Sequence, residues 1–336
     1  MRSIGVIMVK TTSKVEQCEI CLNNSKISKI MEYNGKKVCI ECYYSLKYPR
    51  DFKKMMEEIE TILPKKNSKN INKNIKNNNK IINKNKNNNF NNNKDSHNNL
   101  NNDEKSYKNN LNKKYDCIVA LSGGKDSVIA LYLLMKDFNV NPLCITVDNK
   151  YLPFETIENC YNIVRYFNVD WMVINKDFTQ LFKKTIEKGE SPCGKCSEYI
   201  MREIWKVAND LNINKIITGH ELPFGTSPFK KLKNNITMIR LLTGYKLTDK
   251  ERRSILKKLP WKNPNLGGYT TNCLVLGPAI KNFYKKYGYS FEFRRICAMI
   301  RYGLIDKEEA KNYLKCPEVP KEIYEELKRR GLDLEG

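Results

Sequence analysis

The sequence predicts an α/β protein built on a doubly wound parallel sheet, with a small cysteine-rich module before it and a mainly helical region after it. Between residues 115 and 245, short apolar runs of strand length alternate with segments whose apolar residues recur at helical spacing. This alternation is typical of parallel sheets covered by helices on both faces. Two C-x2-C pairs precede this region, and several amphipathic stretches follow it.

Composition divides the 336 residues into four parts. Residues 1–64 hold the cysteine pairs and an amphipathic helix expected over 43–63. Residues 65–114 are dominated by Asn and Lys, and we interpret them as a disordered linker, because so few apolar side chains cannot offset the entropy of ordering. Residues 115–245 form the predicted α/β domain. Residues 246–336 are the helical region expected to complete the site, and the pattern includes Asp306 as a helix N-cap.

The first four cysteines have the spacing of a four-thiolate zinc site. Cys18 and Cys21 form one pair, Cys39 and Cys42 form the other, and seventeen residues separate the pairs. This spacing is within the range of zinc ribbons, and four thiolates fill the tetrahedral coordination of Zn²⁺. We therefore predict a structural zinc ribbon. Four unligated buried cysteines are the alternative.

A polar turn between a strand and a helix is the centre of the predicted site. Residues 117–121 are apolar and of strand length, and residues 128–138 show helical spacing. The hexapeptide between them is Ser122-Gly123-Gly124-Lys125-Asp126-Ser127. Glycines let the backbone approach a ligand, and the N–H groups at the helix start, with the lysine and the serines, supply donors for phosphate. Neither Walker A spacing nor the dinucleotide pattern G-x-G-x-x-G is present.

This hexapeptide resembles the PP-loop of the ATP pyrophosphatase superfamily, whose members bind ATP, adenylate a substrate and release pyrophosphate. The resemblance implies a Rossmann-like fold and an enzyme that uses ATP and Mg²⁺. It implies that Lys125 is catalytic and stabilises the leaving pyrophosphate, and that Asp126 acts on Mg²⁺ or on the loop geometry. A carboxylate interacting with the helix dipole is the alternative for Asp126. The ATP-contacting residues it implies are Ala120, Leu121, Ser122, Gly123, Gly124, Lys125, Asp126, Ser127, Gly219 and His220.

Asp148 ends the second predicted strand, residues 143–148. Ligands of parallel sheets lie beyond the carboxyl ends of the strands, so Asp148 is expected to face the nucleotide beside the loop. A cap in the loop that follows is the alternative role for this side chain.

A third C-x2-C pair, Cys193 and Cys196, lies just before a helix predicted over 197–211. Alone, such a pair can be a redox dithiol, part of a metal site or a chance spacing. The run from this pair to Gly219-His220 is similar to the segment of PP-loop tRNA thiolases in which C-x2-C precedes a helix, a strand and Gly-His. That resemblance implies a [4Fe-4S] cluster held by Cys193, Cys196 and Cys273, with one iron left open for sulfide.

Two other interpretations of these cysteines stay open. They are a second zinc site and a catalytic pair in which one cysteine carries a persulfide that the other resolves. The chain also departs from the thiolases, which usually continue after Gly-His with Asn and two acidic residues. Here Glu221 follows His220 and is the nearest acidic residue. The C-terminal C-x2-C pairs common in 2-thiouridine enzymes are lacking.

The chain is strongly basic, with a formal net charge of +23. Thirteen Lys and three acidic residues in 65–114 account for +10 of it, so the remainder is also basic. Basic surfaces attract polyanions, which agrees with tRNA as the partner, although a lysine-biased genome is the alternative explanation. Contact with a polyanion, or a solvated helix face, is expected for Arg240, Arg252, Arg253, Arg294, Arg295 and Arg301.

The remaining composition indicates the compartment. No apolar run approaches the roughly 20 residues of a membrane span, and no signal-peptide pattern is present, so we expect a cytoplasmic protein without membrane contact. Twelve cysteines in such a chain favour metal and redox chemistry over a disulfide framework. Homodimer formation is left open.

The function predicted from these features is ATP-dependent tRNA thiolation. A pyrimidine carbonyl oxygen attacks the α-phosphate of ATP, and sulfur then displaces AMP from the adenylated base. The sulfur would come from sulfide or a sulfur-carrier protein through the catalytic cysteines Cys193 and Cys196, with Cys273. Two alternatives stay open: an N-acetyl sugar amidotransferase, which shares the cysteine ribbon, the PP-loop and a tail like residues 300–310, and a zinc-ribbon nucleic-acid-binding module with a degenerate nucleotide site.

Overall fold

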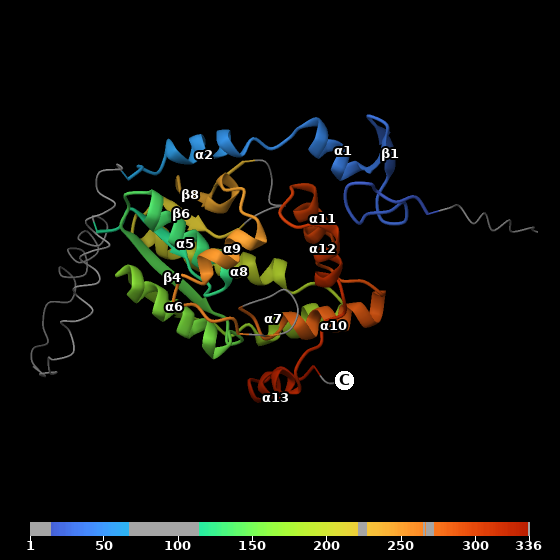
Figure 1. Ribbon diagram of the computed structural model, residues 1–336. Helices are drawn as coiled ribbons and strands as arrows, with labels where there is room; N and C mark the ends of the chain where they lie inside the picture. The colour runs from blue at the N-terminus through green and yellow to red at the C-terminus, as the bar shows by residue number, and fades with distance from the viewer. Residues whose placement is uncertain (1–14, 67–113, 221–226, 265, 267–271, 335–336) are drawn as a thin grey trace, which may run out of the picture.

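The computed structural model describes residues 15–66, 114–220, 227–264, 266 and 272–334. Its centre is a six-stranded sheet in the order β5-β4-β3-β6-β8-β7. In that order the strands are Asp170–Asn175, Pro142–Asp148, Cys117–Ala120, Lys215–Thr218, Thr237–Arg240 and Phe229–Lys231. Figure 1 labels β4, β6 and β8 of this sheet. Every neighbouring pair is parallel except β7 and β8, which are antiparallel. The predicted α/β class is confirmed, and β7 and β8 extend the sheet beyond the strands expected from the sequence.

Helices cover both faces of the sheet. α5 (Lys125–Asp137) and α6 (Phe154–Phe167) share one core with Cys117 and Val119 of β3. α8 (Cys193–Asp210) shares the opposite core with Ile118 of the same strand. Alternate β3 side chains therefore enter different helix layers, as a strand buried on both faces requires. This arrangement confirms the doubly wound sheet.

The N-terminal module is an antiparallel hairpin of β1 (Ile30–Tyr33) and β2 (Lys36–Cys39), followed by α1 (Ile40–Lys47) and α2 (Phe52–Glu60). The single helix expected over 43–63 was wrong, because the chain leaves the helix before Pro49, whose ring disfavours helical backbone in the residue before it. A new helix begins after the N-cap Asp51, whose carboxylate accepts the N–H of Lys54 at 2.9 Å.

The C-terminal region is helical, as predicted. After β8 come η1 (Leu241–Gly244), α9 (Asp249–Leu256), α10 (Leu276–Tyr287), α11 (Phe293–Arg301), α12 (Lys307–Tyr313) and α13 (Lys321–Arg329). Asp306 caps α12 as expected, accepting the N–H of Glu309 at 2.7 Å. α11 and α12 lie beside the N-terminal hairpin (Figure 1), where Cys297 of α11 packs among the ribbon cysteines. The C-terminal helices thus join the cysteine module to the sheet.

Three further findings concern the linker, membrane-spanning helices and one additional helix. The proposed linker over 65–114 lies outside the described residues, apart from its first two residues and its last. Within the described ranges, no helix has both the length and the apolar character needed to cross a bilayer. α7 (Thr179–Glu187), which follows β5, is a further helix that the sequence did not predict.

Candidate active site at the end of β3

The hexapeptide 122–127 forms the turn between β3 and α5. Gly124 is the N-cap and α5 begins at Lys125, so the free N–H groups of the first helical turn are directed beyond the strand end. The Ser127 hydroxyl oxygen accepts hydrogen bonds from the backbone N–H and the hydroxyl of Ser122, both at 3.1 Å, and donates to the carbonyl of Gly124 at 3.0 Å. Ser127 was expected as a phosphate donor. In this structure the Ser127 hydroxyl proton is instead used within the loop, in the hydrogen bond to the Gly124 carbonyl.

Gly123 and Gly219 bring neighbouring backbones close to the loop. Gly123 has φ of +71°, and a Cβ there would lie 2.2 Å from the carbonyl oxygen of Thr156 on α6. The indole N–H of Trp261 also donates to the Gly123 carbonyl at 3.0 Å. A Cβ on Gly219, just after β6, would lie 2.7 Å from the carbonyl group of Asp126. Only glycine fits at these two positions, and both contacts hold the loop in place.

Asp126 forms an ion pair with Arg252 of α9. The guanidinium Nη1 lies 3.0 Å from Oδ1, and the Arg252 side chain is 3% exposed. The expectation that Arg252 contacts a polyanion, or faces solvent, was therefore wrong: it is buried and balances the charge of Asp126. The sequence could not pair these residues, because 126 positions separate them and Arg252 resembles an ordinary cation on a helix surface. The pair fixes α9 against the loop.

Lys125 is partly buried and lies near charged residues of the C-terminal helices. Burial lowers the pKa of its ammonium group, while the carboxylates of Asp126 and Asp249 oppose that shift. Its predicted contact with pyrophosphate stays a prediction.

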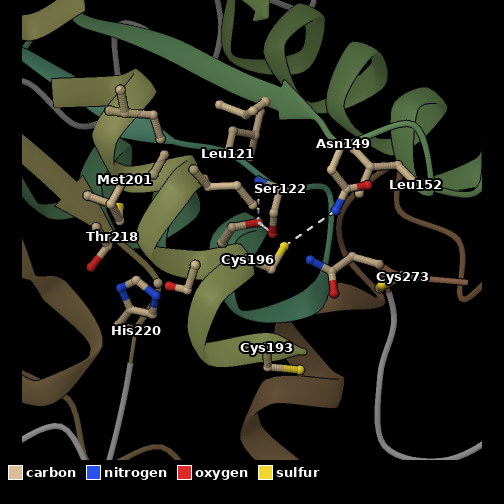
Figure 2. A pocket seen from close by; sticks show the side chains of 18 of the residues that line it. Leu121, Ser122, Asn149, Leu152, Cys193, Cys196, Met201, Thr218, His220 and Cys273 are labelled. Carbon is tan, nitrogen blue, oxygen red and sulfur yellow. Dashed lines mark hydrogen bonds between the residues drawn. The ribbon is translucent and has the colours of Figure 1, made fainter. Parts of the chain in front are cut away.

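A cavity of about 300 Å³ opens beside the loop, between the ends of β3, β4 and β6 and the start of α8 (Figure 2). Its wall includes predicted ATP-site and cysteine residues: Ala120, Leu121, Ser122, Asp126, Ser127, Cys193, Cys196, Gly219, His220 and Cys273. The structure thus brings the start of the loop and the three cysteines to one cavity, although they lie far apart in the sequence. Gly123, Gly124 and Lys125 belong to the loop without lining this cavity.

Asn149, rather than Asp148, lines the cavity. Side chains alternate along β4, so Ile145, Val147 and Asn149 face the cavity while Asp148 points to the other side. The Asp148 carboxylate instead accepts the backbone N–H of Lys150 at 2.9 Å, the capping role that was the alternative. The expected placement of Asp148 beside the loop 122–127 was wrong by one residue, because Asn149 takes that place.

Cys193 and Cys196 occupy the first turn of α8, which begins at Cys193 rather than at the expected position 197. Cys193 is exposed, whereas Cys196 and Cys273 are partly buried. The side-chain amide of Asn149 lies 3.6 Å from the Cys196 sulfur (Figure 2). Burial raises the pKa of Cys196 and of Cys273 to about 12, and repulsion from a neighbouring cysteine adds to each shift. Both thiols therefore keep their protons near neutral pH unless a cation binds them.

The ribbon cysteines form a second, separate cluster. The sulfurs of Cys18, Cys21, Cys39 and Cys42 lie within 4.8 Å of one another and are buried. In the part of the chain that the structure describes, the three cavity cysteines form no comparably tight group. From α11, Arg301 donates to the Cys42 sulfur at 3.3 Å. The ribbon geometry therefore suits a single metal ion whose thiolate charge Arg301 offsets in part.

His220 follows β6 and lies at the cavity wall (Figure 2). Burial lowers the pKa of its imidazole, and the nearby guanidinium of Arg240 lowers it further, so the ring is neutral near pH 7. Glu221, which follows it, lies outside the described residues.

No protein-family model matches the chain. It is 47% identical over 321 residues to the uncharacterized protein MJ1599 of Methanocaldococcus jannaschii, a match that covers 95% of this chain and all of that protein. It is also 31% identical over 112 residues to the tRNA-cytidine(32) 2-sulfurtransferase of Polynucleobacter asymbioticus. The chain belongs to the family of MJ1599, within the PP-loop ATP pyrophosphatase superfamily.

The likeness of this PP-loop protein to named enzymes is partial. Its match to the sulfurtransferase covers 31% of this chain and 35% of that enzyme. Among solved structures, the U34-tRNA thiolase NcsA from Methanococcus maripaludis, with its [4Fe-4S] cluster, matches at a TM-score of 0.37 and 14% identity, covering 89% of this chain and 88% of that one. A structural similarity this low does not identify the activity of this chain.

Proposed function

We propose that this PP-loop protein activates a pyrimidine base of tRNA with ATP and then transfers sulfur to it. The observation that carries the proposal is that the wall of one cavity contains Ser122 of the loop together with Cys193, Cys196 and Cys273. A site that only adenylated its substrate would not need three cysteines there. The partial match to a tRNA-cytidine(32) 2-sulfurtransferase supports the same reaction class.

The adenylation step uses the loop. The carbonyl oxygen of the base attacks the α-phosphate, the new bond joins base oxygen to phosphorus, and pyrophosphate leaves. The N–H groups of the first turn of α5 and the ammonium of Lys125 stabilise the negative charge on the leaving group. When bound, Mg²⁺ would add neutralising charge on the phosphates. Because Asp126 already pairs with Arg252, its proposed role is to hold the loop geometry.

The three cavity cysteines fit a multi-iron cluster better than a single zinc ion. Zinc–sulfur bonds of about 2.3 Å keep the ligand sulfurs of one ion within roughly 4.6 Å of each other. The ribbon sulfurs, all within 4.8 Å of one another, lie close to that limit, whereas the sulfurs of Cys193, Cys196 and Cys273 are not all within 4.8 Å of one another. A cubane spreads its thiolates over separate irons. We therefore assign Zn²⁺ to the ribbon and [4Fe-4S] to the cavity.

Sulfur transfer then takes place at the cysteine end of the cavity. Cys193, Cys196 and Cys273 would hold a [4Fe-4S] group, which would supply an iron site for sulfide. Cys193 is exposed, so sulfide from solution or from a sulfur-carrier protein can enter the cavity past it. The amide of Asn149 holds Cys196 in the cavity wall. Sulfur attacks the adenylated carbon, the carbon–oxygen bond breaks, and AMP leaves with the former carbonyl oxygen.

The proposed function is tested with anaerobically purified protein, ATP, Mg²⁺, sulfide and tRNA transcribed in vitro. Mass spectrometry of the digested tRNA should detect a thiolated pyrimidine, with matching amounts of AMP and pyrophosphate. Lys125→Met should lower the yields of thionucleoside and of pyrophosphate. Cys196→Ala should abolish the thionucleoside and leave some tRNA-dependent pyrophosphate release. If Cys196→Ala converted an N-acetyl sugar with ATP and ammonia as fast as the wild type does, this result would contradict thiolation and favour the sugar amidotransferase.

A further inference from the structure

A second hollow of about 720 Å³ lies along the outer side of α8, and we name it the α8 groove. Its walls come from α8, from the β7–β8 hairpin and from His220. Ser197, Met201 and His220 also line the cavity of the candidate active site. The groove therefore adjoins the cavity where the chemistry is proposed, and these three residues lie between the two hollows.

Positive charge dominates the α8 groove. Arg202, Lys230, Lys233 and Arg240 line it, against one acidic residue, Glu198. The Glu198 carboxylate already pairs with Lys195 at 3.0 Å. Lys230 and Lys233 are exposed, and within the described ranges neither forms an ion pair. This charge is available to a polyanion such as a phosphate backbone.

The groove also offers an aromatic surface. Trp205 of α8 lines it, and the indole N–H donates to the backbone carbonyl of Lys233 at 3.3 Å. That carbonyl precedes the Asn234-Asn235 turn, whose two residues have φ of +58° and +56°, the backbone of a tight hairpin turn. The ring and the lysine are thus held beside each other by the hairpin. Flat aromatic faces next to cations are the usual elements of single-strand RNA sites.

We propose that the α8 groove binds the single-stranded RNA segment that flanks the base to be modified. Phosphates lie against Arg202, Lys230 and Lys233, one unpaired base stacks on Trp205, and the target base passes His220 into the cavity. A single strand suits this route, because a base must leave its stack to enter a cavity of about 300 Å³ and an unpaired base does so at the lowest cost. This inference names the RNA-binding surface of the proposed function and rests on it.

The test compares two double variants of the full chain with equal changes of charge. Lys230→Glu/Lys233→Glu alters the groove, and Lys257→Glu/Lys258→Glu alters exposed residues just after α9, which packs on the other face of the sheet. Binding of a labelled single-stranded oligouridylate is measured by fluorescence anisotropy over a range of salt. The groove variant should bind at least about tenfold more weakly. The slope of log binding constant against log salt concentration should become shallower by about 1.4, because each of two lost phosphate contacts contributes roughly 0.7. The control variant should bind within about twofold of wild type.

A second readout addresses stacking. Bound oligouridylate should quench tryptophan fluorescence in the wild type, and Trp205→Phe should remove that quenching, although two other tryptophans remain. Equal weakening in both double variants, or displacement of the RNA by polyglutamate at equal charge concentration, would overturn the proposal. If the groove variant formed as much thionucleoside as the wild type, the α8 groove would be refuted as the RNA-binding surface, and the proposed function would stand. Groove-dependent RNA binding without any thionucleoside would refute the proposed function alone.

Discussion

Replacing Gly123 with alanine should destabilise the protein more than the same change at Gly288, although both glycines have φ in the left-handed region, +71° and +76°. An alanine in this conformation costs about 1–2 kcal/mol at either site. At Gly288 a Cβ would meet nothing within 4 Å, whereas at Gly123 it would lie 2.2 Å from the backbone oxygen of Thr156. Relieving that overlap requires the loop or α6 to move, at a further cost of about 1–3 kcal/mol.

The two variants are compared by urea denaturation and by calorimetric titration with ATP. We expect Gly288→Ala to lose about 1–2 kcal/mol of unfolding free energy and to bind ATP like the wild type. Gly123→Ala should lose about 2–5 kcal/mol and bind ATP more weakly, because its displaced loop no longer aligns the N–H groups of α5. Equal losses of stability, with equal ATP binding, would refute the idea that Gly123 fixes the loop against α6.

Three further predictions concern charged and thiol groups. Arg252→Met should cost about 1–3 kcal/mol in urea denaturation, since it leaves a partly exposed carboxylate without its buried partner, and an unchanged midpoint would contradict this. Arg301→Leu should weaken zinc retention against a chelator by about 10–100-fold, whereas Arg294→Leu, exposed on the same helix, should not. In metal-free protein at pH 8, the exposed Cys316 should be alkylated well before Cys196, whose raised pKa of about 12 keeps it a neutral thiol. Peptide mass spectrometry measures this order, and faster modification of Cys196 would show that its environment is misassigned.

Local patterns were sufficient to predict much of this protein. The apolar run before Ser122 and the helical spacing after it placed the loop correctly, because both periods are set by short-range geometry. The spacing of the ribbon cysteines predicted a cluster in which all four sulfurs meet. Asp306 was identified as a helix cap from its position alone.

Features that depend on side-chain direction or on distant partners were not predictable. Asp148 and Asn149 are adjacent polar residues at a strand end, and only the strand register decides which of them faces the cavity. Arg252 looks like a surface cation until the packing of α9 buries it against the loop. Nothing in the sequence near Cys297 marks it as a neighbour of the ribbon, and its contact with the ribbon cysteines arises only because α11 returns to the N-terminal module.

The claim that one cavity joins an adenylating loop to a cysteine-held cluster is tested most directly by metal analysis. Iron, zinc and acid-labile sulfide are measured in anaerobically purified wild type, Cys193→Ala and Cys316→Ala, the last an exposed cysteine outside the cavity. We predict about one zinc in all three proteins, and about four irons with four sulfides in wild type and Cys316→Ala only. Zinc alone in the wild type, with no iron or sulfide and no change in Cys193→Ala, would contradict the account.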